Sequence, residues 1–355
     1  MKDIKKKKVA LLCIRGLPAQ YGAYDQTSHE LVSNKECVNY EFIVPCDKTM
    51  IDSIYDRKNV LRFFLKKRDG GIGTILYGVK GTLISIINGA RTLVFFGYGL
   101  APIFPLLRLF GLKVICNVDG IEWKREKWSF LAKSYFKLCE FISAYSPILR
   151  VYDAAAIKKY YLKKYNANGT LIFYGSDTEE LKQDNHENDM TTDEEYAIVV
   201  MRMEPENNIL NIVNAFANSS VNMNLKIIGP STNFFEKNCI PVINQSENIN
   251  YLGPIYDRKT LIKVRSNASL YVHGHSVGGT NPTLVEACHI GKPIVAHNNQ
   301  FNKEVLKDSG LFFSSAEDLT EIIIKEQWKN ILPPQLSSDY AWCTISQKYI
   351  TLFEI

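Results

Sequence analysis

The sequence predicts an α/β protein made of two doubly wound parallel-sheet domains. Three observations support this fold class: the length of 355 residues, two successive series of alternating apolar runs and helical segments, and an acid-rich polar stretch between the series. Domains of about 100–200 residues are usual, so the length fits two of them. Strands that alternate with helices favour parallel sheets joined by crossover helices.

The first series opens on the continuous apolar run Val9–Ile14, which stops at Arg15-Gly16 as expected for a strand buried on both faces. Similar runs predict further strands at Glu41–Val44, Thr92–Phe96, Lys113–Val118, Ile148–Tyr152 and Thr170–Tyr174. Helical segments are predicted at Ser28–Ser33, Ile75–Ile87, Trp128–Ala144 and Ala154–Tyr165.

The second series follows a predicted interdomain linker at residues 177–195. Its strands are predicted at Tyr196–Met201, Leu225–Ile228, Ile249–Leu252, Ser269–His273, Pro293–His297 and Leu311–Phe313. Its helices are predicted at Ile209–Asn218, Lys259–Ser266, Pro282–His289 and Ala316–Lys325. The sequence thus predicts a first domain over residues 1–176 and a second over 196–339. A last helix lies in 340–355, where no strand follows, and we expect it to pack back on the first domain.

Composition excludes several classes of protein. Hydrophobic residues make up 46% and charged residues 22% of the chain, which excludes disordered and collagen-like sequences. The apolar stretch Thr92–Leu107 is too short to span a bilayer and contains two prolines, so we expect no transmembrane helix. The eight cysteines form no CxxC pair, and the N-terminus lacks a signal-peptide cleavage site. We therefore expect free, mostly buried thiols in a cytoplasmic protein.

The charge is distributed unevenly along the chain. Residues 1–175 carry 28 Lys and Arg against 14 Asp and Glu, a balance of +14, while the remainder carries 14 against 23, a balance of −9. A basic half indicates an anionic partner, either nucleic acid or an acidic membrane surface. A solvated surface that is merely lopsided is the alternative.

The segment Tyr271–Ala287 carries the clearest chemical signal. A predicted strand ends at His273, a glycine-containing loop follows, and a helix starts with Asn281 as its N-cap and Pro282 at the first helical position. Backbone N–H groups at a helix N-terminus favour phosphate, and Glu286 one turn later could accept hydrogen bonds from sugar hydroxyls. A tight strand–helix turn with a solvated Glu286 is the alternative.

Three further segments end predicted strands. Arg202 follows the first strand of the second domain, where it could hold a diphosphate or pair with Glu204 or Glu206. The loop Arg15–Gly22 lacks the GxGxxG dinucleotide pattern. Asp119 lies in Asn117-Val-Asp-Gly120, which is either a site carboxylate or a turn. Trp123 and Trp128 are interleaved with cations, as in lipid-headgroup or RNA surfaces.

Taken together, six segments carry a resemblance over essentially the whole chain: Arg15–Gly22, Asn117–Arg125, Tyr174–Asp177, Arg202–Asn208, Tyr251–Asp257 and His273–Pro282. The chain resembles bacterial GT-B glycosyltransferases of glycosyltransferase family 4, in particular their rhamnosyltransferase-like branch in capsular and cell-wall polysaccharide synthesis. The resemblance implies the GT-B fold, with two Rossmann-like domains facing a cleft. It also implies retaining sugar transfer from a nucleotide diphosphate donor without a metal.

The resemblance also implies roles for individual residues. Arg202 would hold the donor diphosphate, Glu286 the ribose, and Asp119 would face the reacting sugar or the acceptor hydroxyl, which makes these three the candidate catalytic residues. The remaining candidate donor-binding residues are Gly22, Asn207, Gly253, Ile255, His275, Gly278, Gly279, Thr280 and Asn281. Of these, Gly253–Ile255 would line the base and Gly278–Asn281 would cradle the phosphates.

The sequence departs from the family pattern at three places. Gly278 stands where the family has the first of two glutamates, Asn207 stands where it usually has a lysine, and Tyr21-Gly-Ala-Tyr-Asp25 replaces Tyr-Gly-Gly-Phe-Glu. The rhamnosyltransferase-like branch shares the first two losses. The third leaves the identity of the transferred sugar and of the acceptor open.

The expected activity is transfer of L-rhamnose from dTDP-L-rhamnose to a polyprenyl-diphosphate-linked saccharide. Another donor such as UDP-galactofuranose, or a catalytically silent nucleotide-sugar-binding subunit, is the alternative; an oxidoreductase is more distant because GxGxxG is absent. The expected partners are the donor, the lipid-linked acceptor and an anionic membrane surface, with no nucleic acid. We expect the protein on the inner face of the plasma membrane, with residues 1–176 on the acceptor side and 196–339 binding the donor.

Overall fold

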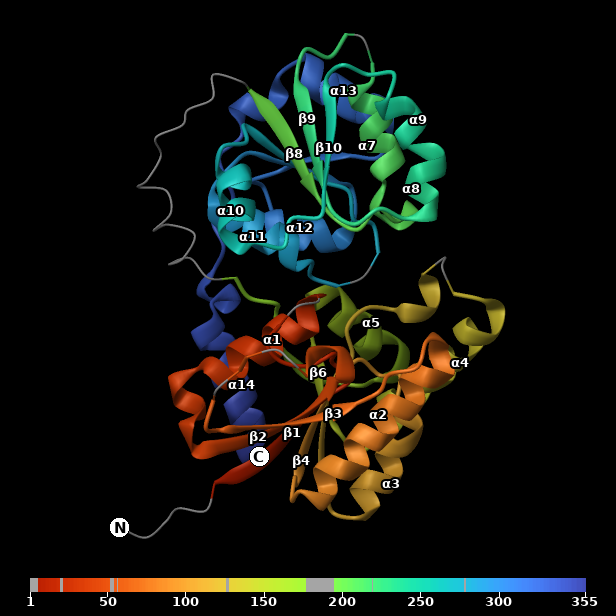
Figure 1. The fold of residues 1–355 in the computed structure, drawn as a ribbon, viewed down its shortest axis with the longest axis vertical. Coiled ribbons are helices and arrows are strands. Elements are labelled where there is room, and N and C mark those ends of the chain that lie inside the picture. Colours follow the sequence, from red (N-terminus) through yellow and green to blue (C-terminus); the bar gives the residue numbers. More distant parts are fainter. Residues whose placement is uncertain are drawn as a thin grey trace. The chain divides into compact units, whose positions relative to one another are not determined.

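The computed structural model describes residues 6–19, 22–51, 54–55, 57–125, 128–176, 195–218, 220–277 and 279–355. Two compact units make up the chain (Figure 1). Unit 1 contains residues 1–175 together with 342–355, and unit 2 contains residues 176–341. Most of the predicted linker, residues 177–194, lies outside the described residues.

Unit 1 is built on a parallel sheet of seven strands in the order β3-β2-β1-β4-β5-β6-β7. The strands are β1 (Lys7–Leu12), β2 (Tyr40–Asp47), β3 (Val60–Leu65), β4 (Thr92–Phe96), β5 (Lys113–Asn117), β6 (Leu149–Tyr152) and β7 (Thr170–Leu171). The strand order reverses between β1 and β4, which makes this sheet doubly wound. The central strands are buried on both faces, as their continuous apolar runs predict.

The helices of unit 1 cover both faces of its sheet. They are α1 (Gly22–Ser33), α2 (Gly70–Ile87), α3 (Phe104–Leu109), α4 (Phe130–Tyr145), α5 (Ala155–Tyr165) and the C-terminal α14 (Trp342–Glu354). Helices α1 and α14 contact each other and share one hydrophobic core with β1 and β2. Right-handed crossovers place α2, α3 and α4, which connect β3 to β6 in succession, on the opposite face (Figure 1).

Unit 2 repeats this architecture with six parallel strands in the order β10-β9-β8-β11-β12-β13. The strands are β8 (Tyr196–Val200), β9 (Asn224–Ile228), β10 (Ile249–Gly253), β11 (Leu270–His273), β12 (Ile294–His297) and β13 (Leu311–Phe313). The helices are α7 (Ile209–Phe216), α8 (Asn233–Asn238), α9 (Ile240–Ile243), α10 (Arg258–Ser266), α11 (Pro282–Ile290), α12 (Gln300–Leu306) and α13 (Ala316–Ile324). The predicted fold class, two doubly wound parallel-sheet domains, is confirmed.

The structure differs from the sequence prediction in a few elements. Strand β3, absent from the prediction, lies at the edge of the sheet, where its partly exposed side chains break the buried-strand pattern. The short helices α8, α9 and α12 were not predicted either. Helix α1 begins at Gly22, six residues earlier than predicted, and β7 stops at Leu171. All eight cysteines are free thiols, and six of them are buried.

Candidate functional site

The strand order of unit 2 reverses between β8 and β11, so the carboxyl ends of these two neighbouring strands form the switch point of the sheet. Ligands of doubly wound sheets bind at this position, at the carboxyl ends of the strands. The two loops touch: a Cβ built on Gly274 would lie 2.0 Å from the carbonyl oxygen of Asn207. The Asn208 amide also donates to the Gly274 carbonyl over 2.8 Å. Only glycine allows this close approach at residue 274.

The loop between β11 and α11 is held in place through its backbone. The carbonyl of His275 accepts hydrogen bonds from the side-chain amides of Asn299 (2.8 Å) and Asn302 (3.0 Å), which belong to the start of α12. The backbone N–H and the hydroxyl of Ser276 both donate to the carbonyl of Glu206. Loop residues anchored on both sides keep the entrance to α11 in one geometry.

Helix α11 begins as the sequence predicts. Asn281 is its N-cap: the side-chain oxygen accepts from the backbone N–H of Thr283 over 3.0 Å and from its hydroxyl over 2.7 Å. Gly291 closes the helix with φ +77°. Thr280 is buried and Gly279 half-buried, whereas Gly278 lies outside the described residues. The arrangement presents a helix N-terminus, and so a partial positive charge, at the switch point.

Arg202 provides a cation at this switch point. It follows β8, its side chain is exposed, and within the described ranges its guanidinium makes no ion pair, so the alternative pairing with Glu204 or Glu206 is not observed. The loop that carries it is fixed by Asn207, a buried residue whose amide donates to the carbonyl of Arg202 over 2.7 Å. Asn207 therefore shapes the loop through this bond.

Glu286 is held by a residue that the sequence analysis did not single out. Its carboxylate accepts a hydrogen bond from Nη1 of Arg265 on α10 over 2.5 Å. The Arg265 side chain is 3% exposed and that of Glu286 35%, so one end of the ion pair is buried and the other reaches solvent. Nε and Nη2 of Arg265 make no hydrogen bond in the described part of the chain. Glu286 is therefore a carboxylate fixed by an ion pair that still reaches solvent.

Gly253 and Ile255 lie at the carboxyl end of β10. Gly253 has φ +73°, a conformation that favours glycine, and a Cβ there would meet nothing within 4 Å. Ile255 is half-buried against the second core of unit 2. An open glycine beside a partly exposed apolar side chain fits the expected base-lining role, which stays a prediction.

Three histidines gather at the ends of β11 and β12. The rings of His273 and His275 are stacked with their centroids 4.6 Å apart, and His273 is fully buried. Burial, reinforced by the neighbouring His275, lowers the pKa of His273 well below its usual value. Burial also lowers the pKa of His297. The rings of His273 and His297 are therefore neutral near pH 7, and Arg202 and the backbone N–H groups supply positive charge at the switch point.

In unit 1, Asp119 follows β5 in a strained conformation with φ +51°. Its backbone N–H donates to the side chain of Asn117 over 3.1 Å, so the predicted turn is present. Its carboxylate lies 4.0 Å from Nη2 of Arg125 and is 17% exposed. Burial raises the pKa of Tyr24 well above its ordinary value, and the Asp119 carboxylate adds to this increase. Asp119 is thus both a turn residue and a held carboxylate.

The segment after Asp119 is anchored by Glu140, a fully buried carboxylate on α4. Glu140 accepts hydrogen bonds from the indole of Trp123 (2.7 Å), Tyr160 (2.7 Å), Lys164 (2.9 Å) and Tyr165 (2.5 Å). The indole N–H of Trp128 likewise donates to Glu122 over 3.2 Å. The indole N–H groups of both tryptophans are therefore bonded within unit 1, and a role of this pair in a lipid-headgroup or RNA surface stays a prediction.

The loop after β1 leads into the N-terminus of α1. Gly22 starts this helix with φ +62° and is exposed. Asp25, within the motif that departs from the family pattern, is buried, and its carboxylate accepts from the backbone N–H of Arg15 over 2.9 Å. Gly16 approaches β2 so closely that a Cβ would lie 2.7 Å from the Cys46 sulfur. Asp25 thus supports the loop, while Gly22 remains accessible.

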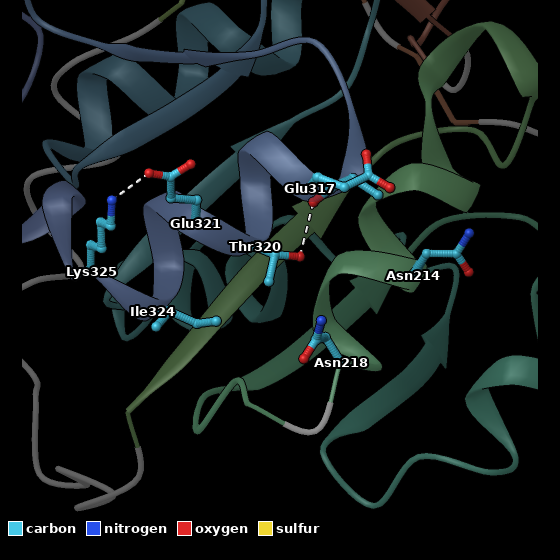
Figure 2. A pocket seen from close by; sticks show the side chains of 8 residues that line it. Asn214, Asn218, Glu317, Thr320, Glu321, Ile324 and Lys325 are labelled. Carbon is cyan, nitrogen blue, oxygen red and sulfur yellow. Dashed lines mark hydrogen bonds and ion pairs between the residues drawn. The ribbon is translucent and has the colours of Figure 1, made fainter.

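A separate hollow lies between α7 and α13 (Figure 2). Asn214 of α7 and Asn218, two residues beyond the end of α7, line one side, and Glu317, Glu321 and Lys325 line the other, where Lys325 pairs with Glu321. None of its lining residues comes from the loops after β8, β10, β11 or β12. We therefore place the candidate site at the switch point. No cluster of three or more His, Cys, Asp and Glu residues suited to a metal occurs in the portion described.

The sequence matches two protein-family models, and the fold matches solved structures. Residues 162–326 match the family described as glycosyl transferases group 1. The chain is a glycosyltransferase. Residues 100–177 of this glycosyltransferase match a second family, described as a domain of unknown function, DUF1972. A comparison with curated proteins gives no match.

Several solved structures share the fold of this glycosyltransferase over 98–99% of its length. Sucrose-phosphate synthase from Thermosynechococcus elongatus has a TM-score of 0.79 at 15% identity, with 98% of both chains covered. Anabaena HepE in complex with UDP-glucose has a TM-score of 0.74 at 14% identity, covering 98% of this chain and 100% of HepE. The α,α-trehalose 6-phosphate synthase of Burkholderia multivorans scores 0.70 at 12% identity, covering 99% and 98%. At these identities the likeness shows the fold, which is GT-B.

Sequence reasoning missed three residues of this glycosyltransferase, for two reasons. Arg265 and Glu140 are buried ionic residues whose partners come from other elements. Tyr24, which faces Asp119, stands in a motif that was noted only for its departure from the family. The only sequence signal for any of them is that Glu140 is the one acidic residue of α4.

Proposed function

We propose that the chain is a retaining glycosyltransferase that moves L-rhamnose from dTDP-L-rhamnose to a polyprenyl-diphosphate-linked saccharide during surface polysaccharide synthesis. The observation that carries the proposal is the switch point of unit 2. There the exposed Arg202 follows β8, and α11 follows the neighbouring strand β11. Helix α11 contributes its N-terminus and the fixed Glu286. These groups suit a ligand with a diphosphate and vicinal hydroxyls.

The donor would bind to unit 2 through three kinds of contact. Gly279, Thr280 and the first turn of α11 would hold the phosphates by backbone N–H groups, and Arg202 would neutralise them. Glu286 would accept hydrogen bonds from the ribose. Two positive features on one diphosphate take over the role of a divalent cation, so we propose metal-independent transfer, which full activity in excess EDTA would support.

The nature of the sugar rests on the resemblance to the rhamnosyltransferase-like branch. The fold itself accommodates other donors, since HepE is found with UDP-glucose. UDP-linked sugars, including UDP-galactofuranose, are therefore the competing donors in the test.

The test mixes purified protein, a panel of nucleotide sugars and a lipid-linked acceptor, and analyses the product by mass spectrometry. The proposal expects a deoxyhexose mass increment with dTDP-L-rhamnose alone. A hexose increment with a UDP-sugar would keep the transferase and replace the donor. Tight nucleotide binding without any product would favour the silent subunit. The structural argument for it is Asn207, which stands where the family usually has a lysine and whose amide bonds to the carbonyl of Arg202.

Asp119 is proposed to act on the acceptor side, in unit 1. Its carboxylate is held near Arg125. Its backbone has a left-handed conformation, which costs conformational free energy in a residue other than glycine and occurs preferentially at functional sites. In retaining transfer the departing phosphate can take the acceptor proton, so Asp119 would orient the acceptor hydroxyl or stabilise positive charge on the sugar.

Asp119→Asn is expected to lose most transfer activity, on the order of 100-fold, while folding and donor binding stay unchanged. The amide keeps the size and the turn but removes the negative charge. Steady-state rates and calorimetric binding of the nucleotide measure the two effects separately. An unchanged rate would leave Asp119 with the turn role only.

The proposed acceptor and the basic half of the chain both favour a position at the membrane surface. A polyprenyl-linked acceptor is confined to a bilayer, and unit 1 contains the exposed cations Lys66 and Arg68 directly before α2. We propose that the protein works as a peripheral protein on the cytoplasmic face of the plasma membrane.

A further inference from the structure

Helix α2 exposes its large apolar residues and buries its small and polar ones. Its buried face consists largely of small and hydroxyl residues, and the hydroxyls of Thr82 and Ser85 there donate to the carbonyls of Gly78 and Gly81 over 2.8 Å. Its outer face carries large apolar residues, with exposed fractions of 77% at Ile72, 46% at Leu76, 54% at Leu83 and 82% at Ile87. A surface helix normally buries its apolar stripe and exposes its polar one.

Helix α4 shows the same reversal. Its buried positions are Cys139, Glu140, Ser143 and Ala144. Its exposed positions are Phe130, Leu131, Leu138, Phe141 and Tyr145, each more than half exposed. At 3.6 residues per turn these five fall within about 100° of one another, and the four of α2 within about 60°. Each helix thus displays a single outward apolar stripe.

The two stripes belong to one surface, because α2, α3 and α4 pack around the same turn. A Cβ on Gly78 of α2 would lie 2.6 Å from Leu100, and the Tyr135 hydroxyl of α4 donates to the carbonyl of Gly99 over 2.8 Å. Helix α3 begins four residues after Leu100. Helix α3 and the residue after it add three exposed apolar side chains: Leu106, Leu109 and Phe110. We call the exposed side of these helices the three-helix face.

The charges on the three-helix face are of one sign. The helices carry Lys80, Arg108, Lys133 and Lys137. Their one acidic residue is Glu140, which is fully buried and bound to Lys164. Twelve of the 22 large hydrophobic residues that are exposed in the described part of the chain lie on or directly after these helices. So large an apolar surface on a soluble domain marks an interaction site, and its cations define the partner's charge.

We propose that the three-helix face is the surface by which unit 1 inserts into an anionic lipid bilayer. Apolar side chains would enter the acyl boundary while the cations contact acidic headgroups. A second copy of the chain is a poorer occupant, because two such faces would bring like charges together. Helix α2 has the length and composition of a membrane span but packs on β1 and β2, with 33% of it buried, so it would lie along the surface. The proposal rests on the proposed function for its purpose, access to a lipid-linked acceptor.

The test is cosedimentation with vesicles of phosphatidylcholine alone and of phosphatidylcholine with phosphatidylglycerol. Wild-type protein is expected on the mixed vesicles, with binding that falls as salt rises. The apolar variant is Leu76→Gln, Leu83→Gln and Phe141→Gln combined, expected to weaken binding at least tenfold. The control, Ile324→Gln with Leu332→Gln, removes exposed apolar residues of unit 2; Ile324 is 46% exposed, like Leu76. It should bind as wild type.

A charge variant separates the two contributions. Lys80→Gln and Lys137→Gln together should reduce binding to mixed vesicles, about fivefold per cation. Charge reversal at Lys66, Lys67 and Arg68, the cluster before α2, should reduce it further. Circular dichroism and nucleotide binding show that the variants remain folded.

Two outcomes would overturn the proposal: equal binding by wild type and the apolar variant, or no wild-type binding to either vesicle. In the second case, a wild-type dimer that the apolar variant abolishes would assign the three-helix face to contact between two copies of the chain. The proposed transfer reaction is separable, since it is measured by product formation. Vesicle binding without product would contradict the proposed function and keep the face, and product without vesicle binding would do the reverse.

Discussion

Arg202→Ala is expected to lower the turnover number by about 30- to 900-fold, equivalent to about 2–4 kcal/mol of transition-state stabilisation. Negative charge grows on the diphosphate as the glycosidic bond breaks, and Arg202 is the exposed cation at the switch point of unit 2. Because this side chain is exposed and makes no ion pair in the described residues, its loss should leave the fold intact. Initial rates at saturating donor measure the effect.

Two variants make this result specific. Arg202→Lys keeps the charge but loses the bidentate geometry, so it should recover part of the rate. Lys237→Ala removes an exposed cation from α8 and should leave turnover unchanged. If Arg202→Ala keeps turnover within a factor of two of wild type, the diphosphate lies elsewhere.

Glu286→Ala is expected to have two separable effects. The first is a loss of roughly 3 kcal/mol in the free energy of unfolding of unit 2, because Arg265 would remain buried without its carboxylate partner. The second is a higher donor KM, because the ribose would lose its acceptor in the ground state and the transition state alike. Urea unfolding measures the first effect and donor titration the second.

A double variant distinguishes the two. Arg265→Met combined with Glu286→Ala removes both charges, so stability should largely recover while the donor KM stays raised. Glu286→Gln keeps an oxygen acceptor for Arg265 and should be milder than Glu286→Ala in both measurements. A donor KM that recovers together with stability would mean that Glu286 only supports the fold.

Local sequence patterns predicted most of the fold. Apolar runs bounded by turn residues predicted every strand of unit 2, because strands buried on both faces are continuously apolar. The pattern failed at β3, an edge strand whose residues are partly exposed, and at α12, a helix of seven residues. Short or edge elements owe their structure to neighbours rather than to their own periodicity.

Local signals also predicted part of the candidate site. Asn281, Pro282 and Gly291 bound α11 where the sequence places its start and end, because capping is decided by contacts within a few residues. The same locality holds for the turn at Asp119, where the Asn117 side chain lies two residues away.

What the sequence by itself determined about this protein is therefore the fold class, the order of most elements and the loops that end at the switch point of unit 2, all of which depend on neighbours in the chain. Only the tertiary structure decided what those loops and helices face. It paired Glu286 with Arg265, 21 residues away, and turned Asn207 onto the carbonyl of Arg202. It also turned the apolar stripes of α2 and α4 outward. Periodicity shows that a helix has an apolar side, but only packing against the sheet shows which side is buried.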